Sequence, residues 1–198
     1  MKKIIALMLS VATVLAVAPQ ALALDAKAIS TSPNYIYADS LDDVDWDNLQ
    51  PTDVVLIPNE NLPADELNNA SAGDSLVPQQ PLTGSVSPYE NSAPTSTWNV
   101  AKSGQYDFSG YTYNSSYLYT CFSFTGKSTY RVKITNLLAS GTLTAKVRGS
   151  LDMKNYRTIE VAAGVTAYFS LGSNDGITSS TKWMLRFNCP VKTEGYVS

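Results

Sequence analysis

Hydrophobic and polar residues alternate along the second half of this chain with the period of two that is typical of β-strands. The alternation is clearest between residues 106 and 148, where four strand-like runs follow one another at 106–113, 117–124, 130–135 and 142–148. The turn-forming residues 114–116 separate the first two runs, and a loop that ends at Ser140 and Gly141 separates the last two. These four runs therefore predict two β-hairpins.

The first predicted hairpin has an apolar face and a face of tyrosines, which comprises Tyr111, Tyr113, Tyr117 and Tyr119. Exposed rings with hydroxyl groups can form a flat platform for a sugar or for another protein. Aromatic pairs across neighbouring strands are also common stabilisers of sheets, so the alternative is a ladder that another element covers. The tyrosine face is thus our first candidate binding surface.

The second predicted hairpin has an apolar face and a basic face. The basic face holds Arg131, Lys133, Lys146 and Arg148, and Lys182 and Arg186 extend it if the last strand lies alongside. Like charges opposite each other destabilise a strand pair unless an anion lies nearby, which makes this face a candidate anion-binding surface. The alternatives are an ordinary outer face with dispersed charge, contact with an acidic segment of the same chain, and binding of an external polyanion. Few aromatic residues interleave with the basic ones, so the pattern does not favour sequence-specific nucleic-acid binding.

Further strand-like runs lie at 97–101, 157–161, 165–171 and 182–189. About eight short strands without a convincing helix predict an all-β fold, an antiparallel β-sandwich of jelly-roll or immunoglobulin-like type. We place this domain at residues 97–198, after a mostly irregular acidic arm.

The N-terminus has the three parts of a secretory signal peptide at residues 1–23. Lys2 and Lys3 give the charged start, residues 4–18 give a short apolar run, and Ala21-Leu22-Ala23 gives a cleavage site. The apolar run is short for a spanning helix, so we favour cleavage over a retained anchor and expect no membrane span afterwards. The sequence therefore predicts export to the outside of the cell.

Charge divides the remaining chain into two opposite parts. Residues 24–98 hold twelve acidic residues and one lysine, whereas residues 99–198 hold five acidic and eleven basic residues. Within the acidic part, Ser40 followed by Asp42 and Asp43 predicts a short helix that ends near Pro51, and 52–58 is a candidate strand. We therefore expect an acidic arm at 24–69 and a flexible linker rich in Ser, Pro, Asn and Gln at 70–96.

Cys121 and Cys189 are the only two cysteines in the sequence. A pair of cysteines in an exported protein usually forms a disulfide, which is our prediction. Strand alternation places Cys121 on the tyrosine face and Cys189 with the core residues of its strand, so the bond requires a β-bulge. Two thiols are the alternative.

The residue types present limit the chemistry that the chain can perform. The sequence has no histidine, which excludes Ser-His-Asp and Cys-His catalysis and histidine-based zinc sites. Five carboxylates in the C-terminal half show no recognisable catalytic pairing; they are Asp107, Asp152, Glu160, Asp175 and Glu194. The carboxylates at 43, 45 and 47 are spaced as in a calcium-binding EF-hand, but Asn48 and Val54 replace the required Gly and Glu. We therefore predict no metal and no cofactor.

Together these patterns predict an exported, non-catalytic binding module that acts at or outside the cell surface. Its expected ligand is a glycan or an anionic cell-surface polymer. The main alternative is a structural protein whose acidic arm or edge strand pairs with another chain. A hydrolase that uses carboxylates is the second alternative.

Overall fold

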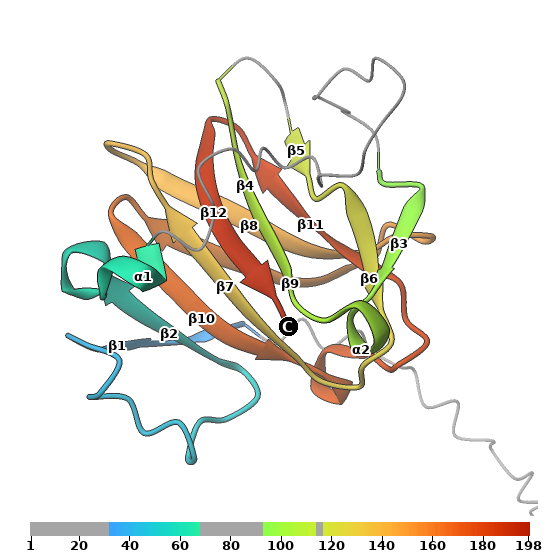
Figure 1. Ribbon diagram of the computed structural model, residues 1–198, viewed down its shortest axis with the longest axis horizontal. Coiled ribbons are helices and arrows are strands. Elements are labelled where there is room, and N and C mark those ends of the chain that lie inside the picture. The colour runs from blue at the N-terminus through green and yellow to red at the C-terminus, as the bar shows by residue number, and fades with distance from the viewer. Residues whose placement is uncertain (1–31, 68–92, 114–116) are drawn as a thin grey trace, which may run out of the picture.

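The structure is a computed structural model that describes residues 32–67, 93–113 and 117–198. Its strands form two facing sheets, and the predicted all-β sandwich is confirmed (Figure 1). The first sheet has the order β1 (Asn34–Tyr37), β2 (Asp53–Pro58), β10 (Val165–Leu171), β7 (Tyr130–Asn136), β12 (Val191–Val197) and β4 (Tyr106–Thr112). The second has the order β3 (Ser96–Asn99), β6 (Phe122–Thr125), β11 (Trp183–Asn188), β8 (Thr142–Gly149) and β9 (Asn155–Ala162), with β5 (Tyr117–Tyr119) also paired to β11.

Short helical segments connect some of these strands. They are α1 (Ala64–Leu67), α2 (Val100–Ser103) and two 3-10 turns at Asn59–Asn61 and Ser173–Asp175. Neighbouring strands pair in antiparallel fashion, except for the parallel pairs β1–β2 and β3–β6. In the part of the chain that the structure describes, no helix has the length and apolar character needed to cross a membrane.

The core lies between the two sheets and is built from the inward residues that alternation predicts. Those of the second predicted hairpin are all buried, namely Tyr130, Val132, Ile134, Leu143, Ala145 and Val147. At the centre, the ring of Trp183 packs against that of Phe124 in the same second sheet, with centroids 4.9 Å apart. It also packs against the ring of Tyr130 in the first sheet, with centroids 5.1 Å apart. Contacts between aromatic rings of both sheets hold the two layers together.

The two predicted hairpins are wrong. β4 pairs with β12 in the first sheet, whereas β5 and β6 pair with β11 in the second. In the same way β7 belongs to the first sheet and β8 to the second. The period of two shows which face of a strand is buried, and the facing sheet buries that face whichever strands lie beside it within its own sheet. The chain crosses between the layers where we expected a tight turn within one layer.

The predicted boundary at residue 97 implied that the acidic arm is separate from the sandwich. In the structure, part of this arm belongs to the first sheet. β2, which lies where the apolar run predicts a strand, pairs with β10, and β1 extends the sheet beyond it (Figure 1). Val54 and Leu56 join the central core, while Val55 and Ile57 pack in a second cluster with Tyr168. β2 is therefore buried on both faces, which explains its continuous apolar run.

The helix predicted after Ser40 is also wrong, because residues 39–49 form bends and turns. Ser40 Oγ donates to Asp43 at 2.7 Å, and Asn48 Nδ2 donates to Asp45 at 2.7 Å. Such local side-chain bonds compete with helix formation. The predicted signal peptide at 1–23 and most of the predicted linker at 70–96 lie outside the described residues.

Candidate functional site

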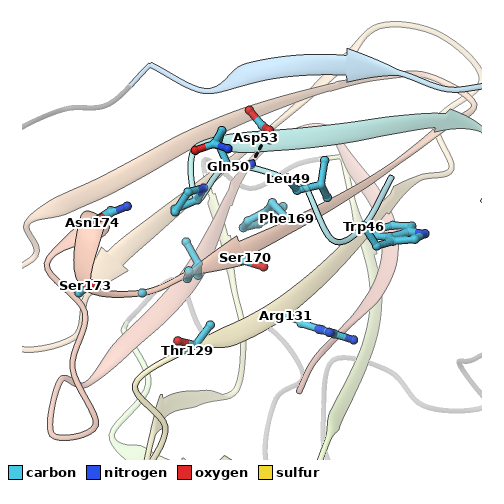
Figure 2. A pocket seen from close by; sticks show the side chains of 13 residues that line it. Trp46, Leu49, Gln50, Asp53, Thr129, Arg131, Phe169, Ser170, Ser173 and Asn174 are labelled. Atoms are coloured by element: carbon cyan, nitrogen blue, oxygen red, sulfur yellow. Dashed lines mark hydrogen bonds between the residues drawn. The ribbon is translucent and has the colours of Figure 1, made fainter. Parts of the chain in front are cut away.

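A groove of about 310 Å³ opens beside the first sheet, between the segment before β2 and the ends of β10 and β7. Figure 2 shows the side chains that line it. From the N-terminal segment these are Trp46, Leu49, Gln50, Pro51 and Asp53, and from the rest of the sandwich they are Thr129, Arg131, Phe169, Ser170, Leu171, Gly172, Ser173 and Asn174. We call it the Trp46 groove. It has an apolar floor and polar walls, as small-molecule sites commonly do.

Trp46 gives the groove an exposed aromatic ring that is held in place. Its indole Nε1 donates to the carbonyl of Leu41 at 3.1 Å, and its ring meets Tyr168 edge to face, with centroids 5.9 Å apart. The side chain is nonetheless 46% exposed. A large ring that is fixed before binding presents apolar area at a low cost in conformational entropy.

Arg131 supplies the positive charge of the groove. It lies on β7 directly opposite Ser170 of β10, with its side chain on the exposed face of the sheet. Among the described residues it forms no ion pair. Figure 2 shows Arg131 and Trp46 at one end of the groove, with Ser173 and Asn174 at the other end.

Asp53 is the single carboxylate among the groove's lining residues, and protein donors already bind it. Its Oδ1 accepts a hydrogen bond from Asn34 Nδ2 at 2.8 Å, and its Oδ2 accepts one from the backbone N–H of Gln50 at 2.7 Å. The side chain therefore shapes the turn that leads into β2. The lining therefore carries one cation, Arg131, and one carboxylate whose two oxygens both accept hydrogen bonds from the protein.

Arg157 lies buried beneath the groove and joins three segments that border it. Its Nε donates to Asp175 at 2.8 Å, its Nη1 to the Ser170 carbonyl at 3.0 Å, and its Nη2 to the Pro51 carbonyl at 2.8 Å. Nη2 also lies 2.6 Å from Asp175 Oδ1, and both side chains are fully buried. Arg157 is thus a positioning residue that fixes the walls of the groove.

The sequence pattern identifies Asp175 only as one of five carboxylates without a catalytic pairing, and it does not single out Arg157. A signal was present, because Arg157 alternates with Ile159 and Val161, which are completely buried. An arginine at an inward position requires a buried partner. Trp46 carried no comparable signal, since its exposure depends on the turns that replace the expected helix.

The four tyrosines of the predicted platform do not share one strand pair. Tyr111 and Tyr113 lie on and just after β4 in the first sheet, whereas Tyr117 and Tyr119 lie on β5 in the second. Tyr111 and Tyr113 are 61% and 63% exposed. The ring of Tyr117 is partly covered by the guanidinium of Arg186, whose Cζ lies 4.1 Å from the ring centroid.

The predicted basic face is divided between the two sheets, because the hairpin that defined it does not form. Arg131 and Lys133 lie in the first sheet, and the second holds Lys146, Arg148 and Arg186, with exposed Lys182 just before β11. Lys133 is buried, and its Nζ lies 2.7 Å from Glu66 Oε2 of α1. Arg148 Nε donates to the Met153 carbonyl at 3.0 Å. The predicted basic face is therefore split between the sheets, although Lys146, Arg148 and Arg186 remain neighbours on the second sheet.

The predicted disulfide is wrong, because Cys121 and Cys189 are not bonded to each other. Both side chains are partly buried and pack against the central core. Burial raises the pKa of the Cys189 thiol. The rule that pairs cysteines in exported proteins rests on the compartment, and it cannot place two sulfur atoms within bonding distance.

The acidic turn before β2 does not assemble a metal site. A shallow hollow of about 500 Å³ beside β1 includes Asp39, Asp43, Asp45 and Asp53 in its lining. Within the described ranges, no three carboxylates or thiols come together as metal ligands would. The EF-hand-like spacing therefore reflects local turn formation.

Comparisons with protein-family models, with curated proteins and with solved structures found no match for this chain. The fold is that of an all-β sandwich, and a functional assignment therefore rests on the residues of this chain.

Proposed function

We propose that this chain is an exported, non-catalytic glycan-binding protein that acts at or outside the cell surface, and that the Trp46 groove holds its ligand. The observation that carries the proposal is the pairing of an exposed, fixed indole with an Arg131 side chain that forms no ion pair within the described chain. The apolar face of a sugar ring packs on an aromatic ring, while its hydroxyls bind amide and hydroxyl groups such as those of Asn174 and Ser170.

Arg131 indicates which glycans the groove prefers. A guanidinium group binds a carboxylate with two parallel hydrogen bonds, and this geometry suits the acid group of a uronic acid. Both oxygens of the one lining carboxylate, Asp53, accept hydrogen bonds from the protein, which leaves Arg131 as the charged lining group that can donate to the ligand. We therefore assign the groove to glycans that contain acidic sugars, such as anionic polymers of a cell surface.

The same lining supports binding in preference to hydrolysis. Glycoside hydrolysis generally requires two carboxyl groups on either side of the scissile bond. Asp53 lines the groove alone and is 7% exposed. The export step of the proposal rests on the signal peptide pattern at residues 1–23.

A glycan array that pairs uronic-acid oligosaccharides with neutral counterparts tests this proposal. We expect Trp46→Ala to weaken binding about tenfold, which corresponds to a loss of about 1.4 kcal/mol. Arg131→Gln should remove the preference for the acidic member of each pair. Tyr37→Ala is the matched control, because Tyr37 is a 78% exposed aromatic residue outside the groove. Equal binding by the Trp46 and Tyr37 variants would overturn the proposal.

An assembly function is the second candidate, and the β4 edge favours it. Of the described strands, only β12 pairs with β4, which ends the first sheet, and Tyr111 on β4 is 61% exposed. An open edge with exposed aromatic residues can add a strand from another chain. Light scattering tests this function. An oligomer that dissociates when Tyr111→Lys is introduced would support it, and a monomer at all protein concentrations would reject it.

A further inference from the structure

Arg186 occupies an unusual position on the outer face of the second sheet. It lies on β11, is 8% exposed, and stacks its guanidinium over the ring of Tyr117. Among the residues that the structure describes, its buried Nε has no hydrogen-bond partner. The same holds for the buried Oδ1 of Asn188, two residues further along the same face. Buried polar atoms in proteins nearly always have partners, so two such atoms on one face of a strand indicate a missing ligand.

The charge around Arg186 points to the nature of that ligand. Lys146 of β8 lies directly opposite Arg186, so two cations face each other across neighbouring strands. The ion pairs of the described chain are Lys133–Glu66 and Arg157–Asp175, and neither involves these two cations. Glu160, the acidic residue of β9, lies opposite Thr144. Repulsion between Arg186 and Lys146 therefore remains uncompensated by a carboxylate within the described residues.

We propose that Arg186 and Lys146, with Tyr117 and Asn188 beside them, form a binding site for a sulfate or phosphate group. A tetrahedral oxyanion has several acceptor oxygens and can bind the guanidinium and the ammonium group at the same time. It would satisfy the Arg186 Nε–H and remove the repulsion between the two cations. A half-turn of the Asn188 amide would present its NH₂ group to the same ion, because the amide carries donors as well as an acceptor.

This oxyanion site is distinct from the Trp46 groove. The groove lies against the first sheet, whereas Arg186 and Lys146 belong to the second. Its ligand is the oxyanion itself, either as a free ion or as an ester group carried by a polymer. The two sites can therefore be tested separately, and neither depends on the other.

The first arm of the test uses inorganic sulfate and the mature chain, residues 24–198. Sulfate replaces chloride at constant ionic strength, while NMR follows the Arg186 Nε–H signal and calorimetry follows the melting temperature. We expect saturable movement of that signal and a rise in melting temperature, since a ligand of the folded state stabilises it. Lys146→Gln should weaken sulfate binding at least fivefold. Lys182→Gln is the matched control, because it removes the same charge from an exposed position just before β11.

The second arm compares dextran sulfate with neutral dextran in place of the free ion. The site is supported if Lys146→Gln weakens binding of inorganic sulfate or of dextran sulfate while Lys182→Gln preserves it. The probe that binds more tightly shows whether the oxyanion is a free ion or an ester group on a polymer. Arg186→Lys keeps the charge and should still weaken binding, because the guanidinium fork is lost. Equal effects of Lys146→Gln and Lys182→Gln would indicate general charge screening and overturn the proposal. So would the absence of binding in both arms.

Discussion

Breaking the buried Arg157–Asp175 ion pair should destabilise the protein severely. Asp175→Asn removes the negative charge and leaves the guanidinium of Arg157 buried beside the carbonyls of Ser170 and Pro51. Loss of one partner from a buried ion pair costs about 3–5 kcal/mol. Because asparagine is close in size and Arg157 keeps both carbonyl partners, we expect a loss of about 3 kcal/mol, at the lower end of that range.

The free energy of unfolding can be measured by urea denaturation followed by tryptophan fluorescence. With a slope of about 2 kcal/mol/M, the midpoint should fall by about 1.5 M. Asp42→Asn is the matched control, because it makes the same substitution at an exposed acid. A surface substitution of this kind should change the free energy of unfolding by about 0.5 kcal/mol or less.

A double substitution tests whether the cost comes from an isolated buried charge. Replacing both partners, as in Arg157→Met with Asp175→Leu, removes the pair without leaving a charge behind. The double variant should therefore be more stable than Asp175→Asn. If Asp175→Asn costs no more than Asp42→Asn, the pair does not hold the groove segments together as we describe.

Three further predictions concern the Glu194 carboxyl, the close approach at Gly195 and the two cysteines. Burial raises the pKa of the Glu194 carboxyl in the folded protein, so its contribution to stability is present below its ordinary pKa and is lost as pH rises through the raised value. Melting curves between pH 4 and 7 should show the natural protein losing stability relative to Glu194→Gln, and parallel curves would contradict this. In Gly195→Ala the new Cβ would lie 1.9 Å from the Lys133 carbonyl oxygen, so urea denaturation should show a loss of at least about 1–3 kcal/mol, whereas a neutral effect would refute the close approach. Alkylation of the unfolded chain without reductant should add two labels to the intact mass, because Cys121 and Cys189 are not bonded, and an unlabelled chain would show the opposite.

The sequence predicted the buried faces of the strands better than the sheets to which the strands belong. The inward positions of β7 and β8, such as Val132 and Val147, are buried as alternation requires. Alternation contains no information on which strand lies beside which, so both hairpins were assigned to the wrong partners. The apolar run at 52–58 predicted β2 as a strand, but the acidic composition around it concealed that this strand belongs to the first sheet.

The candidate site was the least predictable part, because it combines residues that are distant in sequence. Trp46 and Arg131 come together only because β2 joins β10, which lies beside β7. Arg131 was identified as a basic outward residue, but its neighbours were expected to be other cations. The two unpaired atoms beside Tyr117 depend on side-chain packing that no periodic pattern encodes.

The central claim is that the Trp46 groove binds glycans, and the glycan array tests it most directly. The natural mature chain, Trp46→Ala and Tyr37→Ala should be compared on the same array of acidic and neutral oligosaccharides. We predict that the natural chain and Tyr37→Ala bind uronic-acid oligosaccharides equally well and that Trp46→Ala binds them about tenfold more weakly. Binding that survives Trp46→Ala unchanged, or no binding by the natural chain, would contradict the claim.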